Sequence, residues 1–242
     1  MSFEYPVKRL SHSAIKKYID CPFSFKAKYI LKMKQPSNEH FALGGAVHAA
    51  AEFQVRFNLK RNKNLPLQVV LEKYQSQATE EAARLNKFGI KAFREMYPVG
   101  HDLVEQLYFY LIKNKPVAIE QYFSVDLGYD LPVMGYMDVI FEDDALYDFK
   151  TCSKPWPKSK LNNSLQLTIY NEAYKEMYGK FPNTLGIIEL NKKDISITPR
   201  GTTRTTRDRE ILDLTVEKVL KGIRDGDWRR CGKGSCFACS AM

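Results

Sequence analysis

The chain has 242 residues and a mass of 28.0 kDa, which is enough for one large domain with a sizeable core. It carries 37 Lys and Arg against 28 Asp and Glu, a net charge of +9, and this excess favours a polyanionic partner. No apolar run approaches the ~18–20 residues that a membrane span requires, and residues 1–8 contain no secretory apolar core. We therefore expect an intracellular, cytoplasmic protein with no membrane partner.

The first half of the chain has the periodicity of helices. Residues 9–20 predict a helix that is capped by Ser11 or Ser13 and ends near Cys21 and Pro22. A second helix is expected to open around residues 44–45 and to run through residue 53. Further helical patterns cover 67–86 and 100–114, with interruptions expected at 61–66 and 96–100.

The second half is dominated by apolar runs that are typical of strands. They cover 117–126, 132–141, 145–150, 184–191 and 194–199, with helices expected near 162–178 and at about 204–224. This order predicts an α/β fold with a mixed central sheet flanked by helices. We expect a single domain over 1–242, with a helical lobe at about 50–115 and a Cys-rich tail at 229–242.

Two acidic residues and a lysine mark the hairpin that is predicted between 132 and 150. Side chains alternate along a strand, so Asp148 and Lys150 share one face, and the acidic turn at 142–144 lets Asp138 reach the same face. Desolvating two carboxylates is costly unless a divalent cation completes the site. The pattern indicates metal-assisted phosphodiester hydrolysis, although the solvated edge of a hairpin would look the same.

Four further polar residues are candidates for this site. His48 is flanked by small residues that allow close helix packing, so it could deliver an imidazole to a metal or be structural. Glu120 could contribute to the site or pair with a surface Lys or Arg, and the second interpretation is favoured. Gln166 and Tyr170 lie at i and i+4 on one helix face, where they could position the lysine or form a polar rim.

Basic residues gather in two segments. The segment 154–160 contains Trp156 and follows the acidic hairpin, which suits phosphate contact and base stacking. The segment 200–209 is also basic. Both could instead be ordinary solvated loops.

Three of the five cysteines lie near the end of the chain. Cys231, Cys236 and Cys239 are spaced closely enough to reach one centre, and Cys21 is the best candidate for a fourth ligand because Cys152 lies beside the predicted catalytic strand. Four thiolates suit a [4Fe-4S] cluster or a structural Zn²⁺. Disulfides, which are disfavoured in the cytosol, and unused thiols are the alternatives.

These residues together resemble the RecB-like branch of the PD-(D/E)XK nuclease superfamily, which includes CRISPR-adaptation nucleases and phage exonucleases. The resemblance runs from Leu10 to Cys239 and begins with a Ser-capped helix followed by Cys-Pro. The other motifs are Gly45-Ala-Val-His48, Gly135-Tyr-Met-Asp138, Asp148-Phe-Lys150 and Gln166-x-x-x-Tyr170.

The resemblance implies a restriction-endonuclease-like core and a role for each motif. His48, Asp138, Asp148 and the Phe149 carbonyl would bind Mg²⁺ or Mn²⁺, and Lys150 would orient and activate the attacking water. Gln166 and Tyr170 would support Lys150 and the DNA backbone. A [4Fe-4S] cluster on Cys21, Cys231, Cys236 and Cys239 would fasten the two chain ends together.

The resemblance also implies DNA as the partner and a bacterial, archaeal or phage origin. We expect a metal-dependent exonuclease that acts on single-stranded DNA or duplex ends. The alternatives are an inactive DNA-binding subunit and a structure-specific endonuclease with CRISPR-adaptation or recombination protein partners. Cleavage polarity and oligomeric state are left open by the sequence.

Overall fold

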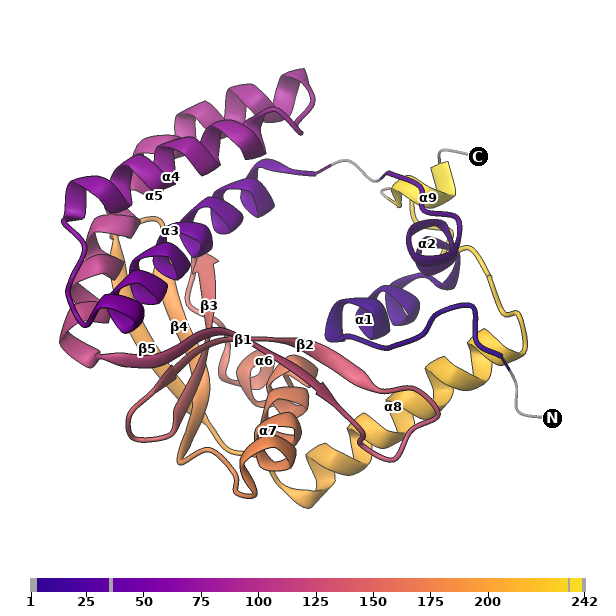
Figure 1. Cartoon of the computed structure of the whole chain (residues 1–242). Helices are drawn as coiled ribbons and strands as arrows, with labels where there is room; N and C mark the ends of the chain where they lie inside the picture. Colours follow the sequence, from indigo (N-terminus) through magenta and orange to yellow (C-terminus); the bar gives the residue numbers. More distant parts are fainter. Residues whose placement is uncertain (1–3, 35–36, 235, 241–242) are drawn as a thin grey trace.

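A five-stranded mixed sheet lies between two groups of helices in the computed structural model of the chain (Figure 1). The structure describes residues 4–34, 37–234 and 236–240, so residues 1–3 of the N-terminal segment that is predicted to lack a secretory core lie outside it. The helices are α1 (His12–Asp20), α2 (Pro22–Phe25), the π-helical turn η1 (Lys26–Ile30), α3 (Glu39–Arg61), α4 (Leu67–Ala82), α5 (Lys87–Asn114), α6 (Lys158–Asn162), α7 (Leu165–Tyr178), α8 (Thr206–Arg224) and α9 (Phe237–Ser240).

The strands follow one another across the sheet in the order of the chain, β1-β2-β3-β4-β5. Their bounds are β1 (Pro116–Val125), β2 (Val133–Phe141), β3 (Ala145–Cys152), β4 (Thr184–Asn191) and β5 (Ser196–Thr202). Neighbouring strands are antiparallel except β3 and β4, which are parallel because α6 and α7 cross over between them. The predicted mixed sheet flanked by helices is confirmed.

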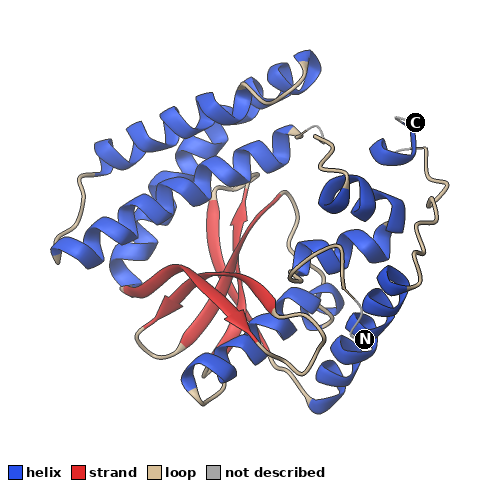
Figure 2. Cartoon of the chain, turned by 45° about the vertical axis from the view of Figure 1, so that its right-hand side comes forward, coloured by secondary structure: helices blue, strands red, loops and turns tan. Residues whose placement is uncertain are grey.

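Helices cover both faces of the sheet (Figure 2), and each face buries a separate apolar cluster. On one face, side chains of α3, α4 and α5 pack against β1 to β5, with Tyr74 and Leu103 fully buried. On the other face, α1, α7 and α8 cover the sheet around Met137 and Leu146. The central strands are therefore shielded on both sides, and β4 is buried from Leu185 to Leu190.

Two expectations about the helical region are wrong. The second helix begins at Glu39 rather than at the Gly44–Gly45 pair, because Asn38 caps it by accepting hydrogen bonds from two backbone amides. The break expected at 96–100 does not occur, and α5 continues through Pro98. Tertiary packing overrides the helix-breaking tendency of proline here, since Gly100 in the following turn is buried against Tyr74 of α4 and Leu43 of α3.

None of the helices in the described part of the chain combines the length and the apolar character needed to cross a bilayer.

Candidate active site

The two aspartates face each other where the pairing of β2 and β3 ends. Val139 pairs with Tyr147, and the next positions outward in this antiparallel register are Asp138 and Asp148. Beyond them the two strands separate, so both carboxylates lie in a fork of the sheet. Both are buried, with Asp148 only 1% exposed. The predicted convergence of these two side chains is what the structure shows.

Two side chains of α7 connect the carboxylates to the lysine. The Gln166 amide donates to Asp148 Oδ1 at 2.7 Å, while its oxygen accepts from Lys150 Nζ at 3.1 Å. The Tyr170 hydroxyl lies 3.4 Å from Oδ1 of both Asp138 and Asp148. Gln166 and Tyr170 therefore hold the acids and the lysine in one network rather than forming a polar helix rim.

His48 approaches Asp138 from α3, on the side of the sheet that the helical lobe covers. Its Nδ1 lies 3.6 Å from Asp138 Oδ2 and 4.0 Å from Glu120 Oε1. One ligand atom from each of His48, Glu120 and Asp138 falls within 4.8 Å of the others, a separation that suits a shared cation. Asp138 Oδ2 also accepts a hydrogen bond from the Phe149 amide, which ties β3 to the same point.

The favoured interpretation of Glu120, a surface pair with Lys or Arg, is wrong. Glu120 stands opposite Asp138 in the register of β1 and β2, and its side chain is 24% exposed. Its φ of 45° is unusual for a non-glycine residue within a strand, and such backbone strain often accompanies functional sites. A prediction of the pairing between β1 and β2 would have revealed this position.

Burial and mutual repulsion disfavour the ionised carboxylates. Burial, and then the charge of Asp138, raise the pKa of Asp148 to about 6. Burial, and then the charges of Asp138 and Glu52, raise the pKa of Glu120 to about 8. Burial lowers the pKa of His48, so its imidazole is neutral at pH 7 and can coordinate a metal ion.

Lys150 keeps its charge in this network. Desolvation opposes the ammonium, but attraction to Asp148 and Asp138 outweighs it and raises the lysine pKa. The lysine is therefore a cation at neutral pH, suited to offset negative charge and to donate hydrogen bonds.

The residues of this site fit a divalent cation such as Mg²⁺ or Mn²⁺. Asp148 Oδ2 is buried and has no hydrogen bond of acceptable geometry among the described residues, although Lys150 Nζ lies 2.5 Å from it. Two carboxylates and an imidazole converge beside it. Carboxylate oxygens with one imidazole are donors that Mn²⁺ and Mg²⁺ accept, and a bound cation would remove the repulsion that raises the carboxylate pKa values.

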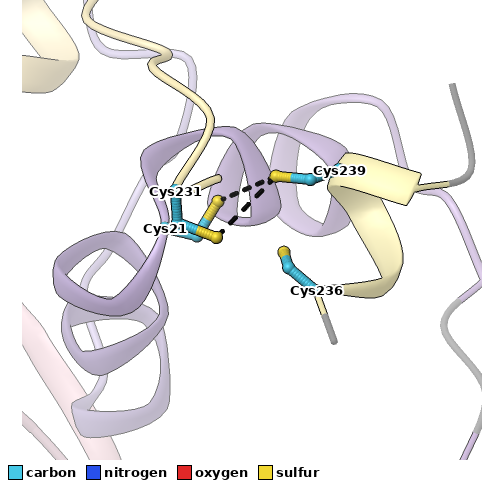
Figure 3. A group of neighbouring side chains, drawn as sticks. All are labelled: Cys21, Cys231, Cys236 and Cys239. Carbon is cyan, nitrogen blue, oxygen red and sulfur yellow. Dashed lines mark hydrogen bonds between the residues drawn. The ribbon is translucent and has the colours of Figure 1, made fainter. Parts of the chain in front are cut away.

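Four cysteines form a second candidate metal site, separate from the group of His48, Glu120 and Asp138 (Figure 3). Cys21 Sγ lies 3.5 Å from Cys239 Sγ, which lies 3.9 Å from Cys231 Sγ, and all four thiols including Cys236 are within 4.8 Å of one another. Cys21 comes from the junction of α1 and α2, the others from the C-terminal segment. The structure thus brings together the four predicted cysteines.

The thiols of Cys236 and Cys239 do not ionise equally by themselves. Desolvation opposes both thiolates, but hydrogen bonds from the Cys239 backbone and the neighbouring thiols lower the pKa of Cys236 to about 7. Desolvation and its role as donor to these thiols raise the pKa of Cys239 to about 12. A cation is needed to hold four thiolates together, so the donor set fits a thiolate-bound metal. Cys152 is buried at the end of β3 and is not a member of the group.

The two basic segments are partly used for internal contacts. In the segment 200–209, Arg200 forms an ion pair with the buried Glu189 at 2.9 Å, and Arg204 donates to the carbonyls of Leu161 and Ser164. These arginines stabilise the fold, so their charges are used for contacts within the protein.

Trp156, in the segment 154–160, packs against the core, and Lys160 Nζ lies 3.6 Å from its ring centroid. That face of the indole is covered, so base stacking there would require Lys160 to move.

Comparison with known proteins finds a family model and solved structures that are similar to this chain. The family model described as the PD-(D/E)XK nuclease superfamily matches residues 9–242. A solved structure from Eubacterium rectale, named "putative exonuclease", is similar with a TM-score of 0.66 and 14% identity, covering 95% of this chain and 86% of that chain. At this identity the likeness shows the fold. No curated protein matches the sequence.

Proposed function

Because this chain belongs to the PD-(D/E)XK nuclease superfamily, we propose that it is a divalent-metal-dependent deoxyribonuclease of the RecB-like branch. We further propose that it is an exonuclease on single-stranded DNA or duplex ends. The observation that carries the proposal is the meeting of Asp138, Asp148 and Lys150 in the fork of β2 and β3, joined by Gln166 and Tyr170. The whole chain would act as one nuclease domain, with α3, α4 and α5 as its helical lobe.

The proposed metal ligands come from three elements of the fold. His48, Asp138 and Glu120 have ligand atoms within 4.8 Å of one another, and Asp148 lies on the Lys150 side of the same site. The Phe149 carbonyl is the fifth proposed ligand, and the position of Phe149 beside His48, with ring centroids 5.5 Å apart, supports this assignment. When bound, the cation polarises the scissile phosphate and lowers the pKa of a bound water.

The roles of Lys150, Gln166 and Tyr170 follow from their contacts. Lys150 remains charged, so it would orient the attacking water by hydrogen bonding and offset the negative charge that develops on the phosphate. It would not remove the proton from that water. Gln166 contacts both Lys150 and Asp148 and would fix their distance, while Tyr170 would align the two aspartates.

The four cysteines would hold a structural metal centre. The family resemblance favours a [4Fe-4S] cluster. The sulfur–sulfur separations in this group, at most 4.8 Å, are close to the distance of about 3.8 Å expected between sulfurs that surround a single Zn²⁺ tetrahedrally. Visible absorption together with iron and zinc content decides between them: a brown protein with iron supports the cluster, and a colourless one with zinc supports the single ion.

The test of the nuclease proposal is cleavage of labelled DNA by Lys150→Ala, with Lys193→Ala, in the exposed turn between β4 and β5, as the control. We expect wild type and control to cleave linear DNA with Mn²⁺ and the Lys150 variant to show no cleavage while still binding Mn²⁺. Cleavage of a closed circle would indicate an endonuclease instead. Failure of the wild type to cleave any DNA with Mn²⁺ would leave the inactive DNA-binding subunit.

A further inference from the structure

A pocket of about 850 Å³ adjoins the candidate active site. Gln166 and Tyr170, which hold the acids and the lysine, form one part of its wall. The rest comes from the N-terminal segment around residues 6–14, from η1 and from the beginning of β2. The volume is within the range of pockets that enclose small ligands.

The fork of the sheet creates this pocket. Where β2 has left β3, the N-terminal segment takes the place of a neighbouring strand, because Leu10 forms a bridge with Val133 and its carbonyl accepts from the Met134 amide at 2.9 Å. The segment then turns into α1 beside β2 (Figure 1). The pocket therefore continues directly from the position of the two aspartates along the same strand, so a strand of DNA with its phosphate at the acids could extend into it.

The lining of the pocket combines cations and aromatic rings. Lys8, Arg9 and Lys32 are exposed at its edge, and Tyr29 and Tyr136 are also lining residues. The Tyr136 ring lies 5.4 Å from the ring of Tyr122, and with 51% of Tyr136 exposed it still offers open surface to a ligand. Among the described residues, no carboxylate lines the pocket. Cations that contact phosphates and rings that stack on bases are the two components of a single-strand binding site.

His12 adds a polar group without a charge. Desolvation, and then the charges of Lys150 and Lys16, lower the pKa of His12 to about 4, so the imidazole is neutral at pH 7 and can both donate and accept a hydrogen bond. Because the charge of Lys150 contributes to this shift in the His12 pKa, the ammonium of Lys150 lies near this wall of the pocket.

We propose that this pocket binds an unpaired nucleotide of the substrate strand, next to the phosphate that is cleaved. The proposal rests on the proposed nuclease function and narrows its substrate. A base can enter the pocket and stack on Tyr136 only when it is separated from the complementary strand, so a fully paired duplex end would have to fray before entering. The enzyme would therefore prefer single-stranded DNA over blunt duplex.

The test measures DNA binding in the absence of cleavage. Fluorescence anisotropy with a labelled oligothymidylate and with a blunt hairpin duplex, in buffer without added divalent metal, gives the affinity for each. We expect Tyr136→Ala to weaken oligothymidylate binding about 5- to 150-fold, from ~1–3 kcal/mol per stacked base, and duplex binding less than twofold. The control Tyr178→Ala, an exposed tyrosine at the end of α7, should bind both as wild type does.

A second variant tests the cationic edge. Arg9→Ala should weaken oligothymidylate binding and reduce the slope of log affinity against log salt by about 1, whereas Lys218→Ala on the outer face of α8 should leave the slope unchanged. The pocket proposal is overturned if Tyr136→Ala binds oligothymidylate as wild type does, or weakens both DNA forms equally. Because no divalent metal is added, the binding assay does not depend on whether Lys150→Ala cleaves DNA. A failure of the pocket proposal can therefore be distinguished from a failure of the nuclease proposal.

Discussion

The substitution Glu120→Gln gives a sharp test of the metal site. Glutamine has the shape of a protonated glutamate, so the variant mimics the carboxyl in its uncharged state at every pH. Burial and the nearby acids raise the pKa of Glu120 to about 8. In the metal-free protein, most Glu120 side chains are therefore protonated at pH 6 and half are ionised at pH 8.

The magnitude follows from this pKa. Between pH 6 and pH 8 the ionised fraction of Glu120 rises about 50-fold, and the apparent affinity for Mn²⁺ should rise by the same factor, because a ligand must lose its proton to bind. Asp148, with a pKa of about 6, adds only about twofold over this interval. The Gln variant should thus gain only about twofold in Mn²⁺ affinity between pH 6 and pH 8.

Titration calorimetry with Mn²⁺ at pH 6, 7 and 8 measures these affinities directly. Glu142→Gln, which removes an exposed carboxylate from the turn between β2 and β3, is the matched control and should keep the wild-type pH dependence. If the affinity of Glu120→Gln rises with pH as steeply as that of wild type, Glu120 is not a ligand, and the strain at its backbone has another cause.

Three other predictions concern stability and the cysteine site. The pKa of Glu120 is raised from 4.5 to about 8, so between these pH values the folded protein binds more protons than the unfolded chain. The melting temperature of the metal-free protein should therefore fall as pH rises from about 4.5 to 8. Added Mn²⁺ should restore the melting temperature at pH 8. Cys236→Ser should lose the bound metal and lower the melting temperature, whereas Cys152→Ser should retain the metal; equal metal content in both would refute the four-cysteine site. Gly100→Ala would place a methyl group against the hydroxyl of the buried Tyr74, and denaturant unfolding should show a loss of about 1–3 kcal/mol; unchanged stability would mean that the helices separate freely there.

The sequence was most informative where a pattern is local. Alternation along β3 and the acidic turn were enough to place Asp148, Lys150 and Asp138 on one face, because the geometry of a hairpin leaves few other arrangements. The i, i+4 spacing likewise placed Gln166 and Tyr170 together.

The sequence was least informative where the position depends on packing between distant elements. His48 and Glu120 meet only because α3 lies against β1, and nothing near either residue specifies this contact. The helix through Pro98 depends in the same way on packing, because Gly100 in the next turn lies against Tyr74 of α4 and Leu43 of α3. Local propensity is a weak prior when tertiary contacts compensate for it.

Helix α1 joins the cysteine site to the proposed nucleotide pocket. The two ends of the chain, which meet at the cysteines, are therefore linked to the pocket wall. The helix begins with His12 in the wall of the pocket and ends next to Cys21. The C-terminal segment holds this helix, since Tyr18 donates to the Asp227 carbonyl at 2.8 Å and the Trp228 ring stacks on Phe25, which also lines the pocket. A metal centre at the cysteines would therefore act on the reaction through the position of the pocket wall, with no part in the chemistry at the aspartates.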